Sequence, residues 1–455
     1  MRSRNLATVE LSAPPLSKIT NPRLRLLYCV LAALAVRLLV ALFVYRDLPD
    51  ADKFYEAFGW EMGWAARALA SGHGFSSPYF QWSGPTALEP PLYPWLLSLV
   101  FRAFGIYSLV SAFVILAINS LLSALTCVPV YFSAKESLGP RYAVRAAWVW
   151  AFYPFAIYFS AGRVWEYSLT ALLFTTCFCI VQRLHRWTHP LPWIALGALY
   201  ALTAHSNAAI VATLPFLLGW ALWRAHGEGR RWLLNGVLCI LAFLAVLTPW
   251  TVRNYRIFGQ LIPVRDNIWL EMYADNFGNA PYDRTSPPTA GNRPYPASKP
   301  EEMTKYLTMG EKAYLAEKRA MSLDDLRNRP HYGFLAVKTL RRILYFWTGY
   351  WSFSAQELAD QPYSIPCMCY VSAVSLLMLL GIFRLWKTNR DTLIPYLLLL
   401  GSYPIAYYLT HPLMDYRQPI EPAVVVLGLW GVLGLSRVRN KQAVAVLSQP
   451  GLQPE

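Results

Sequence analysis

Acidic side chains gather in one stretch of the sequence, residues 46–90, which lies between two apolar segments. The stretch contains six acidic and three basic residues, in a chain whose net charge is +15. A carboxylate next to a membrane can remove a proton from a substrate hydroxyl, and charged groups close to a membrane often have a function. These acids could therefore serve a transfer reaction, or they could form a solvated external surface.

Two of these acids are placed by recognisable elements. Apolar residues at helical spacing predict a helix over 54–70 that carries Glu61 in its middle and ends at Ser71-Gly72. The proline-rich run 84–94 predicts a stiff turn that holds Glu89 just above a short helix. Asp50 and Asp52 have the spacing of a metal-binding Asp-x-Asp pair, although such a pair arises easily by chance in an acidic stretch.

Further polar side chains stand where apolar segments end. Arg253 is positioned to bind a lipid phosphate through two hydrogen bonds, or to reach ordinary lipid head groups. Tyr416 and Arg417 could line the same external site or belong to an aromatic belt at the membrane interface. Glu166 and His205 lie in short polar turns between apolar segments, where Glu166 could line the site or form a local ion pair.

The elements that must position these residues are apolar segments of about twenty residues. Of the 455 residues, 55% are hydrophobic and only 15% are charged, and blocks of this length can cross the roughly 30 Å hydrocarbon core of a bilayer. The sequence therefore predicts an all-α integral membrane protein, a single polytopic domain over 1–455 with about ten transmembrane helices. The expected spans lie near 26–45, 108–132, 146–162, 168–184, 190–204, 207–223, 233–250, 366–384, 392–409 and 420–436.

The positions of the basic residues predict the orientation of these spans. Lysine and arginine concentrate in loops that face the cytoplasm. Applied here, the rule places the tails 1–25 and 437–455 in the cytoplasm and the two long loops, 46–107 and 251–365, on the opposite face. Because the cations serve this purpose, the net charge does not indicate nucleic acid as a partner. We expect a bacterial-type inner or plasma membrane with the active site on its non-cytoplasmic face.

Two apolar stretches are expected to lie along the outer interface instead of crossing. Residues 91–104 are too short for an ordinary span, and 334–351 mix cations with aromatic residues, as amphipathic surface helices do. Whether either crosses the membrane remains open from the sequence. Within the second loop, 300–326 reads as one polar helix with Ser298 as its cap.

Several motifs occur in an order that resembles a known superfamily. They are the acidic first loop, Ala70-Ser71-Gly72-His73-Gly74-Phe75, the run from Gly84 to Pro94, Tyr153-Pro154 with Glu166 downstream, Pro249-Trp250 with Arg253-Asn254, and Tyr416-Arg417-Gln418-Pro419. Together they resemble the GT-C superfamily of polytopic glycosyltransferases. The similarity is strongest to the branch with protein O-mannosyltransferases, the lipid A aminoarabinose transferase and RgtA/B/C/D-like enzymes.

The resemblance implies a GT-C type fold and an external site that moves a sugar, a hexosyl or pentosyl group, from a polyprenyl-phosphate carrier to a glycan, lipid or protein acceptor, with inversion. It implies a first-loop carboxylate as the catalytic group. In relatives this acid is an Asp at a fixed interval before the Gly-x-Gly-Phe sequence. Counted back from Gly72, the same interval reaches Phe58 in this chain, which is not acidic. The match therefore offers Glu61 first and Asp52 second, with Glu56 as a further alternative. Arg253 and Arg417 would hold the lipid phosphate, while Glu89, Glu166, His205 and Tyr416 would contact substrate.

Two other function classes stay open. A transporter would also combine about ten helices with polar groups, although it is expected to carry charges at mid-helix and repeated halves. A polymerase or ligase of lipid-linked polysaccharide would use the same donors. No phosphate-binding loop or dinucleotide fingerprint occurs, so ATP-driven or nicotinamide chemistry is not indicated. No firm metal-ligand cluster can be read from the sequence, and a divalent metal is possible without being required.

Overall fold

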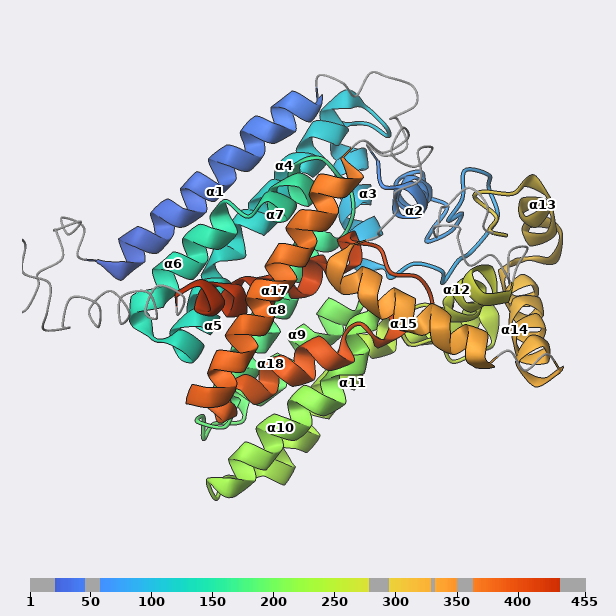
Figure 1. The fold of residues 1–455 in the computed structure, drawn as a ribbon. Coiled ribbons are helices and arrows are strands. Elements are labelled where there is room, and N and C mark those ends of the chain that lie inside the picture. Colours follow the sequence, from blue (N-terminus) through green and yellow to red (C-terminus); the bar gives the residue numbers. More distant parts are fainter. Residues whose placement is uncertain (1–20, 46–57, 278–293, 329–331, 350–362, 434–455) are drawn as a thin grey trace, which may run out of the picture.

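The structure is a computed structural model that describes residues 21–45, 58–277, 294–328, 332–349 and 363–433. It is built from helices packed side by side, with a group of shorter helices at one end (Figure 1). Within the described ranges, the extended pairing is a single isolated bridge between Ser76 and Pro85. The all-α fold class expected from the sequence is confirmed.

Seven stretches of the described residues are long and apolar enough to cross a membrane. The chain is therefore a multi-pass integral membrane protein. The spans are formed by α1 (Pro22–Tyr45), α4 (Leu109–Leu125) with α5 (Cys127–Leu138), α8 (Tyr167–Leu184), η2 (Ala208–Thr213) with α10 (Leu214–Gly227), α11 (Trp232–Phe258), α17 (Ser364–Thr388), and α18 (Arg390–Ser402) with α19 (Ile405–Leu409).

The expected count of about ten spans is not confirmed, because two of the expected segments form shorter helices and the last is only partly described. The segment 190–204 gives α9 (Leu191–Ala204), and the last expected span is helical over 421–433, where the described part ends. The expected span 146–162 is broken into α6 (Pro140–Ala151) and α7 (Pro154–Ala161). Pro154 has no N–H to continue α6, and it begins a new helix at the position that prolines favour.

A buried arginine on α1 compensates for this break. Arg37 is fully buried and donates hydrogen bonds to the carbonyl oxygens of Trp150 and Ala151, at 3.2 and 2.8 Å. These carbonyls end α6, where Pro154 cannot donate to Trp150 and only the N–H of Tyr153 reaches that carbonyl, at 3.2 Å. Because an unsatisfied carbonyl in hydrocarbon is costly, Arg37 serves the fold.

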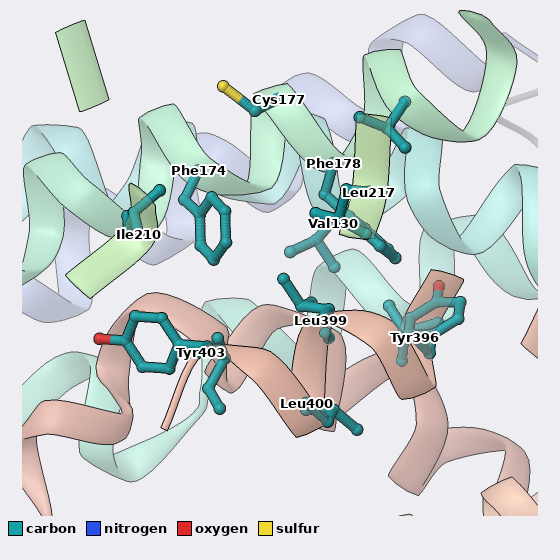
Figure 2. Close-up of a cluster of buried hydrophobic side chains, with 14 of the residues drawn as sticks. Val130, Phe174, Cys177, Phe178, Ile210, Leu217, Tyr396, Leu399, Leu400 and Tyr403 are labelled. Carbon is teal, nitrogen blue, oxygen red and sulfur yellow. The ribbon is translucent and has the colours of Figure 1, made fainter. Parts of the chain in front are cut away.

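The membrane core packs aromatic and aliphatic side chains between helices distant in sequence. In Figure 2, Phe174 and Phe178 of α8 face Leu399 and Tyr396 of α18 and Tyr403, the residue that follows α18. Elsewhere, helices approach closely at glycine: a Cβ on Gly197 of α9 would lie 2.0 Å from the carbonyl oxygen of Cys239 on α11. Small residues at contacts between helices are the usual means of packing in membranes.

The two long loops supply the helices at the end of the molecule that carries the candidate site. These are α2 (Trp60–Ala70), α3 (Leu92–Phe104), α12 (Ile268–Met272), η3 (Tyr273–Phe277), α13 (Pro300–Met309), α14 (Glu311–Asn328) and α15 (Tyr332–Thr348). Figure 1 shows α2, α12, α13 and α14 on the same side of the bundle. The prediction of a single helix over 300–326 is wrong, because Gly310, with a φ of 77°, separates α13 from α14. The predicted cap is also wrong, because the N-cap residue of α13 is Lys299 and not Ser298.

Candidate active site

Glu61 lies in the first turn of α2 and not in the middle of a helix, as the sequence had suggested. Gly59 causes this difference. Its φ of 84° is left-handed, and a Cβ there would lie 2.9 Å from the carbonyl oxygen of Val164. The helix therefore starts immediately after Gly59. The unpaired N–H groups of this first turn favour the charged form of Glu61, but burial has the larger effect.

The environment of Glu61 favours its neutral form. Burial raises the pKa of this half-buried carboxyl to about 7, and the charges of Glu89 and Glu271 add to the effect, against the opposing charge of Arg265. A group with a pKa near neutrality can accept and return a proton at physiological pH. The arrangement therefore gives Glu61 the acidity that a general base needs.

Glu89 is buried, with 5% of its surface exposed, and pairs with Arg265 at 3.4 Å between Oε1 and Nη2. Its Oε2 has no hydrogen-bond partner among the described residues. Burial raises the pKa of Glu89, while Arg265 lowers it and Glu271 raises it further. The two loops thus meet at this site, because Glu89 comes from the first and Arg265 from the second.

Arg265 is the cation around which these acids gather. Burial acts to lower its pKa, but the nearby charges of Glu89, Glu271 and Glu166 together outweigh burial and raise the pKa above its usual range. Glu61 also lies within electrostatic reach of Arg265. The guanidinium therefore stays charged, in surroundings that contain an excess of carboxylates.

Glu166 precedes α8 and is 4% exposed. Its Oε1 accepts a hydrogen bond from Asn207 Nδ2 at 3.2 Å, and Oε2 makes none within the described part of the chain. Burial raises its pKa to about 8, with a further contribution from Glu89. Glu166 thus belongs to the same electrostatic group as Glu61 and Glu89.

His205 makes hydrogen bonds to the backbone of other helices and not to the acids around Arg265. Its Nε2 lies 3.4 Å from the carbonyl oxygen of Val246, and its own carbonyl oxygen accepts a hydrogen bond from the N–H of Leu92 at the start of α3. Through these bonds His205 connects α9 and α11 with the base of the first loop. Its role in binding substrate stays a prediction.

Arg253 stands at the same end of the molecule and holds the first loop. Its two terminal nitrogens donate to the carbonyl oxygens of Thr86 and Phe75, both at 2.6 Å, and its guanidinium lies over the ring of Trp250. The structure therefore places Arg253 among the contacts that shape the loop bearing Glu89. Its predicted contact with a lipid phosphate stays a prediction.

The expected C-terminal element divides into two parts. Arg417 is 1% exposed and is held by an ion pair with Glu421 and by hydrogen bonds to Ser375 Oγ and the Trp347 carbonyl oxygen. Tyr416 makes a different contact, with its hydroxyl 2.9 Å from His411 Nε2. The charge of Arg417 is thus balanced by Glu421 inside the protein. The predicted contacts of Tyr416 and Arg417 with substrate stay predictions.

Asp52 and Glu56, the other candidate bases, lie outside the described residues. Arg265, Glu271 and Asp275 are the residues that sequence reasoning missed. They lie in and beside a stretch whose charge is nearly balanced, and no motif separates them from ordinary loop residues. The sequence held no signal for them, because the burial of Glu89, which makes a partner favourable, becomes visible only in the fold.

A model of the dolichyl-phosphate-mannose-protein mannosyltransferase family matches residues 88–252. This segment is similar to those mannosyltransferases. It contains Glu89, Glu166 and His205 but not Glu61 or Arg265. A search of curated proteins by sequence finds no match.

The fold is similar to that of the archaeal oligosaccharyltransferase AglB from Archaeoglobus fulgidus, solved with an inhibitory peptide and a dolichol-phosphate. The TM-score is 0.50 at 12% identity, over 94% of this chain and 53% of AglB. This chain therefore spans about half the length of that structure. ArnT from Cupriavidus metallidurans, bound to undecaprenyl phosphate, matches with a TM-score of 0.37 at 13% identity, over 88% of this chain and 77% of ArnT. The expected resemblance to GT-C glycosyltransferases is confirmed.

Proposed function

We propose that this protein is a membrane glycosyltransferase that moves one sugar, a hexosyl or pentosyl group, from a polyprenyl-phosphate donor to an acceptor hydroxyl. The observation that carries the proposal is the position of Arg265, within electrostatic reach of Glu61, Glu89, Glu166 and Glu271. A proton acceptor and a cation for a phosphate thus lie together at one end of the molecule. The similarity of 88–252 to dolichyl-phosphate-mannose-protein mannosyltransferases supports the donor class.

In the proposed reaction, Glu61 removes the proton of the acceptor hydroxyl. The acceptor oxygen forms a bond to the anomeric carbon, and the bond from this carbon to the phosphate oxygen breaks. The departing polyprenyl phosphate leaves with the bonding electron pair, and Arg265 stabilises its charge. Attack opposite to the leaving group inverts the anomeric configuration. The contribution of each group comes from being in place before charge develops.

We also propose that this end faces away from the cytoplasm. The basic connection before α11, with Arg230 and Arg231, lies at one end of that helix, and Arg253 lies near the other end. The rule that cationic loops stay in the cytoplasm then orients the carboxylates outward.

The test uses purified protein with a set of polyprenyl-phosphate sugars and measures the release of free polyprenyl phosphate when acceptor is present. Loss of a general base typically costs about 10²- to 10⁴-fold, so we expect Glu61→Gln to lose at least about 100-fold. The matched control is Glu301→Gln, at an exposed position on α13. Full activity of Glu61→Gln would transfer the role to Asp52 or Glu56.

Two other outcomes separate the competing classes. Transfer of a glycan block would indicate a polymerase or ligase. Failure of every donor, together with substrate flux in vesicles, would indicate a transporter.

A further inference from the structure

A second group of ligand-type side chains lies beside the carboxylates around Arg265. It consists of Glu271 on α12, Asp275 on η3 and His411 in the turn after α19. His411 Nδ1 lies 2.9 Å from Asp275 Oδ2 and 3.6 Å from Glu271 Oε2. One possible ligand atom from each residue lies within 4.8 Å of the others. None of these residues is explained by the proton and phosphate roles proposed above.

These separations fit the coordination shell of a small divalent ion. Donor atoms of histidine and carboxylate lie about 2.1 Å from such an ion, so two of them are about 3.0 Å apart at a right angle and about 3.4 Å apart at the tetrahedral angle. The distances of 2.9 and 3.6 Å in the structure are close to these values. The separation between Glu271 and Asp275 is no more than 4.8 Å, so a modest movement of the carboxylates would bring all three residues around one ion.

The side chains are held in place by outer contacts, as metal ligands usually are. Tyr416 Oη lies 2.9 Å from the other ring nitrogen of His411, and Asn267 Nδ2 donates to Glu271 Oε1 at 3.0 Å. These contacts fix the orientation of the imidazole and of one carboxylate.

A buried arginine of α15 joins the two segments that carry the ligands. Arg342 Nη2 donates to the carbonyl oxygen of Asp275 at 3.0 Å, and Nη1 donates to that of Leu409 at 2.9 Å. Asn276 Nδ2 also donates to the Leu409 carbonyl oxygen, at 3.1 Å. The backbone around Asp275 is thus tied to the chain just before His411.

An independent observation concerns the buried acid next to this group. Glu89 is about 95% buried, and its Oε2 has no hydrogen-bond partner among the described residues. Glu89 and Glu271 are close enough for their charges to interact. A buried carboxylate oxygen without a partner is costly, so a cation bound beside Glu271 would stabilise the ionised form of Glu89.

We propose that Glu271, Asp275 and His411 bind one divalent first-row ion, such as Mn²⁺ or Zn²⁺. A set of two carboxylates and one imidazole suits these ions better than Mg²⁺ or Ca²⁺, which favour oxygen ligands throughout. A bound ion would supply positive charge next to the site that receives the donor phosphate, and this role rests on the proposed function. The binding itself does not, because the site is made of this chain's own residues.

The test titrates metal-freed full-length protein in detergent with MnCl₂ and follows free Mn²⁺ by electron paramagnetic resonance. We expect one ion per chain and displacement of Mn²⁺ by Zn²⁺. Asp275→Asn and His411→Gln should each weaken binding by at least about 10-fold, the lower end for disturbing a metal site. Asp391→Asn, an exposed aspartate on α18, is the matched control and should bind as the unmodified protein does.

Two results would overturn the proposal. One is the absence of saturable binding by the unmodified protein, which would mean that His411, Asp275 and Glu271 contact one another without a metal ion. The other is unchanged affinity in both variants while their thermal unfolding stays normal. Glu271→Gln serves as a further variant if either of the first two fails to fold. The binding test contains no sugar donor, so a negative result would not contradict the proposed transfer reaction. That reaction is tested separately by the release of polyprenyl phosphate.

Discussion

The backbone N–H of Ala87 donates a hydrogen bond to Glu311 Oε1 at 2.6 Å, although the two residues are 224 positions apart. Glu311 begins α14 in the second loop, and its Oε2 accepts a hydrogen bond from the hydroxyl of Tyr306. On the other side, Arg253 holds the carbonyl oxygen of Thr86. The segment just before Glu89 is therefore fixed by a carboxylate and a guanidinium, so that both loops determine the position of Glu89.

We predict that Glu311→Ala lowers both stability and sugar transfer. The change leaves the buried N–H of Ala87 without its acceptor, which costs about 1–3 kcal/mol. Thermal unfolding in detergent and the release of polyprenyl phosphate measure the two effects. Glu301→Ala, exposed on the neighbouring helix, should change neither. Normal transfer by Glu311→Ala would show that the loop keeps its shape without this contact.

The rate of transfer should depend on the ionisation of Glu61. Burial raises the pKa of this carboxyl to about 7, and only the ionised form can accept the acceptor's proton. The value of kcat/KM should therefore rise with pH up to about 7 and level off above it. Measurements from pH 5.5 to 8.5 test this expectation. A rate that is flat over the whole range would contradict a base with this pKa.

Stability should change with pH in the opposite direction. Burial raises the pKa of Glu166 from 4.5 to about 8, so the neutral carboxyl favours the folded state. This contribution is fully present below about pH 4.5 and is lost as pH rises through about 8. Between pH 5 and 7.5 the loss is about 3 kcal/mol, since each unit of pKa difference is worth about 1.4 kcal/mol.

Thermal unfolding at several pH values measures this loss. Glu166→Gln keeps an oxygen for Asn207 but cannot ionise, so its unfolding temperature should fall less between pH 5 and 7.5. An equal fall in the variant and in the unmodified protein would assign the effect to other groups.

Arg265 should contribute to the rate more than to the fold. We expect Arg265→Gln to lower kcat by about 10²- to 10³-fold, the usual effect of removing one group that stabilises developing charge. Because the change also removes the partner of Glu89, thermal unfolding must be recorded beside the rate. Arg256→Gln, at an exposed position near the end of α11, is the control. A similar rate loss in both variants would point to a general effect of charge.

The sequence predicts the helices well where apolar runs are long and uninterrupted, as in α1, α8 and α11. It fails where one residue changes the backbone, as at Pro154 and Gly59, because such breaks depend on what packs around them. Glu61, Glu89 and Glu166 could be nominated from the sequence, since each acid has unusual neighbours along the chain. Arg265 could not, because its partner Glu89 is 176 positions away and only the fold brings the two together.

A glycine substitution can test how α2 presents Glu61. Gly59 and Gly72 both have left-handed φ angles, 84° and 83°, so alanine strains the backbone at either position by about 1–2 kcal/mol. Only at Gly59 would the new Cβ meet the Val164 carbonyl oxygen, at 2.9 Å, whereas nothing lies within 4 Å at Gly72. Gly59→Ala should therefore unfold at a lower temperature than Gly72→Ala and transfer sugar more slowly, because the first turn of α2 must move. Equal rates in the two variants would mean that the start of α2 does not control Glu61.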